Sequence, residues 1–231
     1  MKLKKLRQTG LLLMISALVL SGCTSEPNPT TPPSEVTTEA TTLLTTPTRG
    51  VWTDNIYTNA FANIRFTRSD GFTIKEENYL VESSGLDADS FCAPGEAFTD
   101  AMLESPTIHD MAALSTNGAD VAVVFNNLRI DNPFGDTDTS AESFLNIMQM
   151  MIAQQEQTDD MLFVMDKGVT DFKLGDNDYK MLKATMTFET EDGTYYVYQH
   201  FLARKVGDYI VTVIITYGGA QTLAGIATAF L

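Results

Sequence analysis

Three stretches near the end of the chain decide its fold: YKMLKATMTF at residues 179–188, TYYVYQHFLAR at 194–204 and YIVTVIITY at 209–217. Each is rich in the β-branched and aromatic residues that strands favour. The two connections contain Asp192-Gly193 and Gly207-Asp208, which are typical of tight hairpin turns. We therefore predict three consecutive antiparallel strands.

Apolar runs upstream extend this sheet into an α+β fold. Val121–Phe125 is apolar at every position, which indicates a strand covered on both faces, and helices are expected to provide the cover. The best helix begins at Thr139, where Thr139 and Glu142 have capping-box spacing, and runs to about Gln155. The other expected elements are strands at Asn63–Thr67 and Phe72–Lys75 joined by Asp70-Gly71, a helical turn at Glu77–Glu82, and helices at Ile108–Leu114 and within Ala220–Leu231.

The first 22 residues have the layout of an export signal. Four positive charges, on Lys2, Lys4, Lys5 and Arg7, precede a largely apolar run of ten residues from Leu11 to Leu20. A membrane-spanning helix needs about 20 apolar residues. The run is therefore typical of the core of a signal peptide rather than of a spanning helix.

The end of this leader, Leu20-Ser21-Gly22-Cys23, resembles the lipobox of bacterial lipoproteins. The resemblance implies cleavage before Cys23 and a diacylglycerol on its thiol, which would hold the chain to the extracytoplasmic face of the cell membrane. The small side chains of Ser21 and Gly22 suit an extended backbone in a protease site. An ordinary cleaved signal with an incidental cysteine is the alternative.

The segment behind the leader has the composition of a linker. Among its 25 residues, Thr24–Thr48 has ten Thr and five Pro and no aromatic residue, so it cannot bury enough surface to offset the entropy of ordering. We predict a signal peptide at 1–22, a lipidated Cys23 with a disordered linker at 23–49, and one domain at 50–231.

Composition narrows the possible functions. The chain has 15 Lys and Arg against 30 Asp and Glu, a formal charge of −15, which argues against nucleic-acid binding. Two Cys and two His leave little for a Cys-rich zinc site or a His-based metal centre. The sequence has no Gly-x-Ser-x-Gly elbow, phosphate-binding glycine loop or paired-histidine motif. We therefore predict neither catalytic residues nor a cofactor.

The domain has a characteristic order of motifs: Gly50-Val51-Trp52, Tyr57-Thr58-Asn59, Ile64-Arg65-Phe66-Thr67 and Gly71-Phe72 at the start, Ala119–Leu128 and Ser140–Gln155 in the middle, and Tyr195–Tyr217 near the end. In this order of motifs the domain resembles extracytoplasmic lipoproteins with a PsbP-like fold. In that pattern the first two strands pair through a Gly-aromatic turn. Many relatives have Pro before the Gly-aromatic turn, whereas this chain has Ser69-Asp70-Gly71.

The resemblance implies an α/β/α sandwich around a largely antiparallel sheet, and a non-catalytic binding or assembly module of the cell envelope. Its expected partners are the membrane, through the lipid anchor, and another envelope protein. Because one fold hosts unrelated functions, two alternatives stay open: a calcium- or solute-binding lipoprotein receptor, and an enzyme with an unrecognised site.

Three groups of residues are candidates for ligand contacts. Asp136 and Asp138 can offer hard oxygens to calcium, or can complement the positive end of the helix that follows. Strand alternation places Tyr196, Tyr198 and His200 on one face, where they line a ligand surface or form a layer beneath a packing helix. Cys92 is a reactive thiol or, more simply, a buried one.

Overall fold

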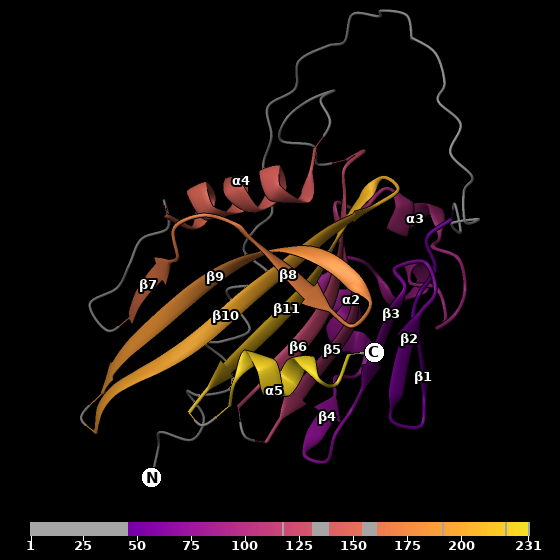
Figure 1. Cartoon of the computed structure of the whole chain (residues 1–231). Coiled ribbons are helices and arrows are strands. Elements are labelled where there is room, and N and C mark those ends of the chain that lie inside the picture. The colour runs from indigo at the N-terminus through magenta and orange to yellow at the C-terminus, as the bar shows by residue number, and fades with distance from the viewer. Residues whose placement is uncertain are drawn as a thin grey trace, which may run out of the picture. The chain divides into compact units, whose positions relative to one another are not determined.

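The structure, a computed structural model, describes residues 46–116, 118–130, 139–153, 161–190, 192–219 and 221–230. Its largest element is an eight-stranded sheet in which every pair of neighbours is antiparallel, in the order β4-β5-β6-β11-β10-β9-β7, with β8 also paired to β9 (Figure 1). The strands are β4 (Phe72–Ile74), β5 (Thr107–Ser115), β6 (Asp120–Asn127), β7 (Met161–Met165), β8 (Thr170–Leu174), β9 (Asn177–Thr190), β10 (Gly193–Val206) and β11 (Tyr209–Gly218).

The three strands expected at the end of the chain are confirmed as β9, β10 and β11, each longer than predicted. Gly193 and Gly207 have positive φ angles, 120° and 57°, at the two hairpin turns. A residue with a side chain is strained there, which explains glycine at both positions. The run around Val121–Phe125 is also confirmed, because it forms the buried centre of β6.

A separate three-stranded sheet packs against one face of the large sheet. It consists of β1 (Val51–Thr53), β2 (Ile56–Asn59) and β3 (Ile64–Thr67). Ring contacts join this part of the chain to the large sheet: the centroid of Phe66 in β3 lies 6.0 Å from that of Phe72 in β4, and that of Phe61, in the turn between β2 and β3, lies 6.1 Å from that of Phe125 in β6.

The expected pairing between the strands at 63–67 and 72–75 is wrong. The strand β3 pairs with β2, whereas β4 pairs with β5, so the turn at Gly71 carries the chain from one sheet to the other. Local turn residues predict a change of direction but do not specify which strand becomes the neighbour.

Among the residues that the structure describes, the helices are short except for one. They are α2 (Glu77–Ser83), α3 (Asp100–Leu103), α4 (Ala141–Ala153) and α5 (Leu223–Ala227), with a 3-10 turn η1 (Ala88–Ser90). The predictions at Glu77–Glu82 and Thr139–Gln155 are confirmed as α2 and α4, except that the expected end of the second helix near Gln155 lies outside the described residues. The start of α4 differs by one residue, because Ser140 Oγ accepts the hydrogen bond from the Ser143 amide at 3.1 Å. The terminal helix is shorter than expected.

The helix expected at Ile108–Leu114 is wrong, because this segment lies in the strand β5. Six consecutive residues of β5, Ile108–Ala113, are buried, and β5 lies between β4 and β6. Pairing with these two neighbours outweighs the helix propensity of Met111, Ala112 and Ala113.

The two faces of the large sheet are covered differently. The helix α4 packs on β9 and β10, where Glu142 approaches Lys180 at 3.4 Å. The strand register puts Phe72 and Phe125, which contact the three-stranded sheet, on the opposite face from Lys180. The result is an α+β architecture around a largely antiparallel sheet. Within the described ranges, no helix combines the length and apolarity needed to cross a membrane.

Candidate functional site

A β-bulge in β5 turns one acidic side chain into the interior. The register between β5 and β6 shifts between His109 and Met111, so Asp110 has no partner residue across the ladder. Bulges redirect side chains and are common beside functional sites. Here the bulge points Asp110 towards β2 and the segment that precedes β1, where its carboxyl group is fully buried.

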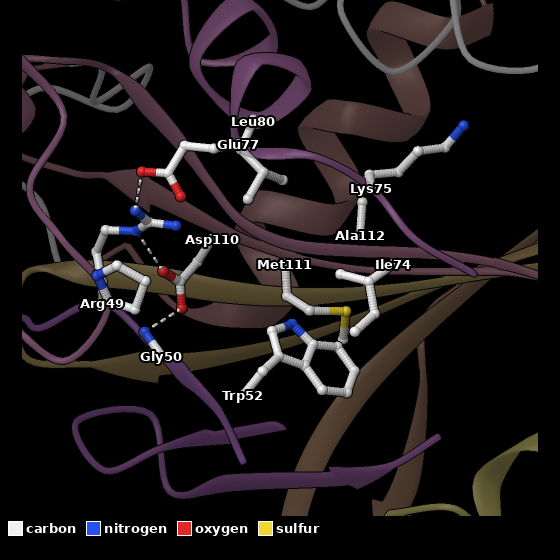
Figure 2. Close-up of a pocket in the computed structure, with 11 residues that line it drawn as sticks. Arg49, Gly50, Trp52, Ile74, Lys75, Glu77, Leu80, Asp110, Met111 and Ala112 are labelled. Carbon is white, nitrogen blue, oxygen red and sulfur yellow. Dashed lines mark hydrogen bonds and ion pairs between the residues drawn. The ribbon is translucent and has the colours of Figure 1, made fainter. Parts of the chain in front are cut away.

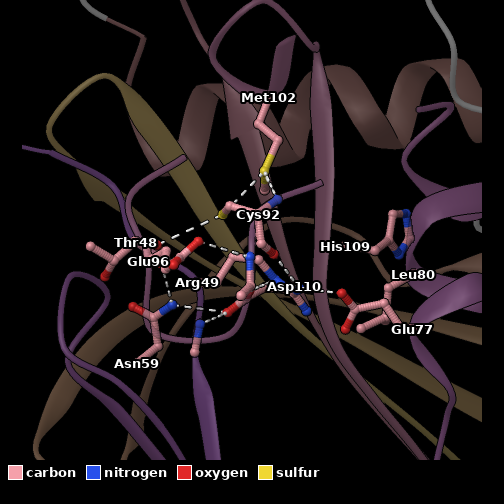
Figure 3. Close-up of polar contacts among 12 residues, drawn as sticks. Thr48, Arg49, Asn59, Glu77, Leu80, Cys92, Glu96, Met102, His109 and Asp110 are labelled. Atoms are coloured by element: carbon pink, nitrogen blue, oxygen red, sulfur yellow. Dashed lines mark hydrogen bonds and ion pairs between the residues drawn. The ribbon is translucent and has the colours of Figure 1, made fainter. Parts of the chain in front are cut away.

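Asp110 is the centre of a hydrogen-bond network that joins distant parts of the chain (Figure 3). Its Oδ2 atom accepts hydrogen bonds from the Gly50 amide at 2.8 Å, from Asn59 Nδ2 at 2.9 Å and from the Tyr57 hydroxyl. Its Oδ1 atom lies 3.5 Å from Arg49 Nε, as an ion pair. The network ties the start of the folded region to β5, the second strand from the β4 end of the large sheet.

Arg49 is buried although it falls at the end of the predicted linker, with a side chain only 3% exposed. Its Nη1 atom donates to Glu77 Oε1 at 3.0 Å and to the Cys92 carbonyl at 2.8 Å. Its guanidinium also lies 4.3 Å from the centre of the Phe91 ring. A buried cation needs partners of this kind, and Asp110 and Glu77 balance its charge.

Burial sets the protonation behaviour of the network. It raises the pKa of Asp110, because burial disfavours the charged carboxylate. Hydrogen bonds from Tyr57, Asn59 and Gly50 and the charge of Arg49 act in the opposite direction and lower this pKa. Burial also raises the pKa of Tyr57 well above its ordinary value of 10. Tyr57 is therefore a neutral phenol that donates its proton to a hydrogen bond and keeps it.

A cavity of about 210 Å³ lies beside this network (Figure 2). Its apolar walls come from four elements or their ends: Trp52 from β1, Ile74 from β4, Leu80 from α2 and Met111 from β5. Arg49, Glu77 and Asp110 lie together at one end. In Figure 2, Leu80 and Trp52 lie on opposite sides of the cavity.

The cavity exists because β4 is too short to cover β5. The strand β4 pairs only with Ala113–Ser115, and beyond it one further bond, from the Lys75 amide to the Ala112 carbonyl, continues the contact. The bulge lies just past this point. The space beside Met111 is therefore bordered by α2 and by β1 of the smaller sheet, instead of by a further strand of the large sheet.

The structure confirms that Tyr196, Tyr198 and His200 lie on one face of β10, but the interpretation as a layer beneath a packing helix is wrong for Tyr196. The strand register places these residues on the face opposite α4, and Tyr196 is 52% exposed. His200 instead is buried. Its ring stacks on Tyr217, with 5.5 Å between centroids, and its Nε2 atom lies 3.1 Å from the Tyr217 hydroxyl.

Cross-strand neighbours extend this exposed region to the edge of the sheet. Leu162 and Val164 of β7 lie on the same face as Tyr196, and they are 49% and 47% exposed. Lys183 lies between these strands, paired with Asp166 at 3.3 Å and 5.5 Å from the centre of the Tyr198 ring. We call Leu162, Val164 and Tyr196 the open face.

The remaining predicted residues lie outside the described ranges or are structural. Leu20, Ser21, Gly22 and Cys23 fall outside them, as do Asp136 and Asp138. Cys92 is a buried thiol whose Sγ lies 3.5 Å from Met102 Sδ, and burial raises its pKa. In the part of the chain that the structure describes, no cluster of three His, Cys, Asp or Glu side chains can hold a metal ion.

Sequence reasoning missed Arg49 and Asp110. One signal was present, because Asp110 is a charged residue within an apolar run, and such residues are buried only with partners. Its partners, however, lie 51 to 61 residues away in the chain. Neither a protein-family model nor a curated protein sequence matches this chain.

Proposed function

We propose that this chain is a lipid-anchored extracytoplasmic protein of the cell envelope whose domain binds a ligand or an envelope protein without chemical catalysis. The lipobox Leu20-Ser21-Gly22-Cys23 supports the anchor, and the Thr- and Pro-rich segment behind it supports a linker to the domain. The anchor places the domain outside the cytoplasm and needs no spanning helix.

The observation that favours binding over catalysis is that the charged groups at the end of the cavity already have partners within the fold. Asp110 accepts three hydrogen bonds, and Arg49 is shared between Asp110, Glu77 and a backbone carbonyl. A general acid or base needs a proton that it can exchange with substrate. These groups instead hold the fold together, and the surface left for a ligand is mainly apolar.

The solute-binding alternative gains support from the cavity itself. An apolar cavity of about 150 Å³ is enough to bind benzene, and the cavity beside Trp52 has about 210 Å³. Its walls are mainly aromatic and aliphatic. Arg49, Glu77 and Asp110 at one end are already paired, and Lys75, which also lines the cavity, has its Nζ atom 5.6 Å from the centre of the Tyr79 ring. We infer that it takes a small neutral apolar group, either a free molecule or a side chain of an envelope protein.

Trp52 is the only tryptophan in the chain, so its fluorescence reports on the cavity directly. Iodobenzene is a suitable probe, because its iodine quenches indole emission on contact. We expect saturable quenching in the unmodified chain and its loss in Leu80→Phe, which narrows the cavity. Leu162→Phe, a matched substitution on the open face, should leave quenching unchanged. Quenching that rises linearly without saturation, equally in all three proteins, would refute the cavity as a binding site.

A pull-down distinguishes a free apolar molecule from an apolar side chain of an envelope protein as the occupant of the cavity. The tagged chain is solubilised gently from membranes, and its co-purifying proteins are compared with those of Leu80→Phe. A protein that is retained by the unmodified chain and by Leu162→Phe but lost from Leu80→Phe identifies a partner side chain. Saturable quenching without such a protein identifies a free solute.

The lipid anchor has its own test, with the second cysteine as the matched control. Cys23→Ala should release the protein from membranes or leave the leader uncleaved. Cys92→Ala should remain membrane-bound, because Cys92 is buried within the domain. A Cys23→Ala protein that is processed and still held by the membrane would contradict the anchor.

Thermal unfolding with and without calcium tests the calcium-binding alternative. Asp136 and Asp138 would supply the oxygens, so calcium should raise the melting temperature of the purified chain. The rise should disappear in a variant with both residues changed to Asn.

We further propose that the domain shares the α/β/α sandwich of PsbP-like proteins. The sequence pattern of its first strand and closing hairpin supports this. Superposition of an experimental structure on a PsbP-like protein tests it.

A further inference from the structure

Two polar atoms at the charged end of the cavity have no hydrogen-bond partner among the residues that the structure describes. They are Arg49 Nε and Asp110 Oδ1, on side chains that are 3% and 0% exposed. Both residues line the cavity, and Figure 2 draws the contact between these two atoms, which are 3.5 Å apart. A buried donor or acceptor that stays unpaired costs stability. This end of the cavity therefore favours a ligand that supplies the missing hydrogen bonds.

The network balances the charges of these side chains without using the two atoms. The three hydrogen bonds that Asp110 accepts all go to Oδ2. Arg49 donates from Nη1, to Glu77 and to a backbone carbonyl. The separation of 3.5 Å between Nε and Oδ1 suits an ion pair but exceeds the usual length of an N–H···O hydrogen bond, about 2.7–3.2 Å. One donor and one acceptor are therefore left at the end of the cavity.

A neutral hydroxyl group matches this pair of atoms. It can donate its hydrogen to Asp110 Oδ1 and accept from Arg49 Nε, because one oxygen atom can lie about 2.8–3.0 Å from both. A carboxylate has no hydrogen to donate and would be repelled by Asp110 and Glu77. An ammonium group cannot accept from Arg49 Nε, and a primary amide would bring a second N–H group into a mainly apolar space.

We propose that the cavity binds a neutral apolar group that carries one hydroxyl, such as a phenol. The hydroxyl bonds to Arg49 Nε and Asp110 Oδ1, and the apolar body lies between Trp52 and Leu80, which face each other across the cavity in Figure 2. The volume of about 210 Å³ exceeds the roughly 150 Å³ that is enough for benzene, so a ring with a hydroxyl fits. This inference rests on the proposed binding role and names the chemistry of the ligand, which comes from a free molecule or from a tyrosine of an envelope protein.

The hydroxyl should determine selectivity. A site whose buried polar groups bond to a ligand hydroxyl discriminates strongly against an analogue without it, because those groups are then left unpaired. A water molecule that enters with the analogue can replace part of the lost bonding and reduces the difference. We therefore expect a hydroxyl in place of a methyl group to lower Kd at least about tenfold.

Two probes of similar size test the inference through the fluorescence of Trp52. They are para-iodophenol, which is neutral at pH 7, and para-iodotoluene, which has a methyl group in place of the hydroxyl. We expect para-iodophenol to quench saturably with a Kd at least about tenfold below that of para-iodotoluene. Leu80→Phe should abolish the difference, whereas Leu162→Phe should keep it.

The position of the iodine atom gives a second measurement. Anomalous diffraction from crystals soaked with para-iodophenol locates it. Because the hydroxyl occupies the charged end of the cavity, the iodine should lie nearer to Ile74 than to Arg49, which are at opposite ends of the group of residues in Figure 2. Iodine beside Arg49 would overturn the inference.

The outcomes separate this inference from the proposed function. Equal Kd values for the two probes, together with saturable quenching by iodobenzene, would overturn the hydroxyl contact and leave the binding role in place. Quenching that saturates with none of the three probes would overturn both.

The pull-down distinguishes the two sources of the hydroxyl. If a protein is lost from Leu80→Phe, changing the tyrosine that it inserts to phenylalanine should reduce its retention at least about tenfold, and unchanged retention would overturn the inference. If no protein is lost, the tighter binding of para-iodophenol assigns the hydroxyl to a free molecule.

Discussion

Replacement of Asp110 by Ala is the most informative change to the network. It removes the acceptor of the Gly50 amide and the Tyr57 hydroxyl and leaves Arg49 with one carboxylate instead of two. Breaking a buried ion pair costs about 3–5 kcal/mol, and each buried donor left without an acceptor costs about 1–3 kcal/mol. These costs overlap, because Asn59 keeps its bond to a backbone carbonyl and water can enter from the cavity.

We therefore expect Asp110→Ala to lower the free energy of unfolding by about 4 kcal/mol, which for a domain of this size corresponds to a fall of roughly 10 °C in melting temperature. Denaturant unfolding followed by circular dichroism measures this change in the free energy of unfolding. Glu77→Ala is the control: it removes the other carboxylate beside Arg49, but that side chain is 48% exposed, so the expected cost is below about 1 kcal/mol. Equal costs for the two variants would refute a buried structural network centred on Asp110.

The remaining predictions concern three titratable side chains whose pKa values are shifted by burial, and one close contact. Burial raises the pKa of Asp120 to about 6, so the stability linked to its protonated carboxyl group is present below pH 3.8 and is lost as pH rises to 6. Asp120→Asn should therefore stabilise the chain by about 2 kcal/mol at pH 7 and by little at pH 3.5. Thermal unfolding at both pH values measures this difference. Burial lowers the pKa of His109 and of His200 to about 4, so stability from these neutral rings is lost as pH falls from 6.5 to 4; NMR titration of the folded chain should give midpoints near 4, and midpoints near 6.5 would contradict this. A Cβ at residue 50 would lie 2.2 Å from the Tyr57 ring, so Gly50→Ala should cost about 1–3 kcal/mol in denaturant unfolding, and a cost near zero would contradict the packing.

The sequence predicted the elements whose patterns are local. The three late strands carry both β propensity and turn glycines, and α4 carries a helical stripe with a Ser at its start. The strand β5 could not be predicted in this way, because its run of Ala and Met residues becomes a strand only between β4 and β6. Pairing across long separations in the chain has no local signature.

The candidate site shows the same limit. The cavity and the Asp110 network depend on a bulge, on the early end of β4 and on partners from the first residues of the folded region. The common face of Tyr196 and His200 followed from strand alternation, whereas their different exposure did not. His200 is buried against Tyr217, whereas Tyr196 lies on an uncovered part of the same face, and only the assembled fold determines how far along that face the cover extends.

Membrane attachment through Cys23 is the claim on which the proposed role depends most. Mass spectrometry of the protein extracted from its native membrane tests this claim most directly. We expect a mature chain that begins at Cys23 and carries a diacylglycerol on the sulfur atom. An unmodified Cys23, or a leader still attached to the extracted chain, would contradict the lipid anchor and with it the proposed place of the domain in the envelope.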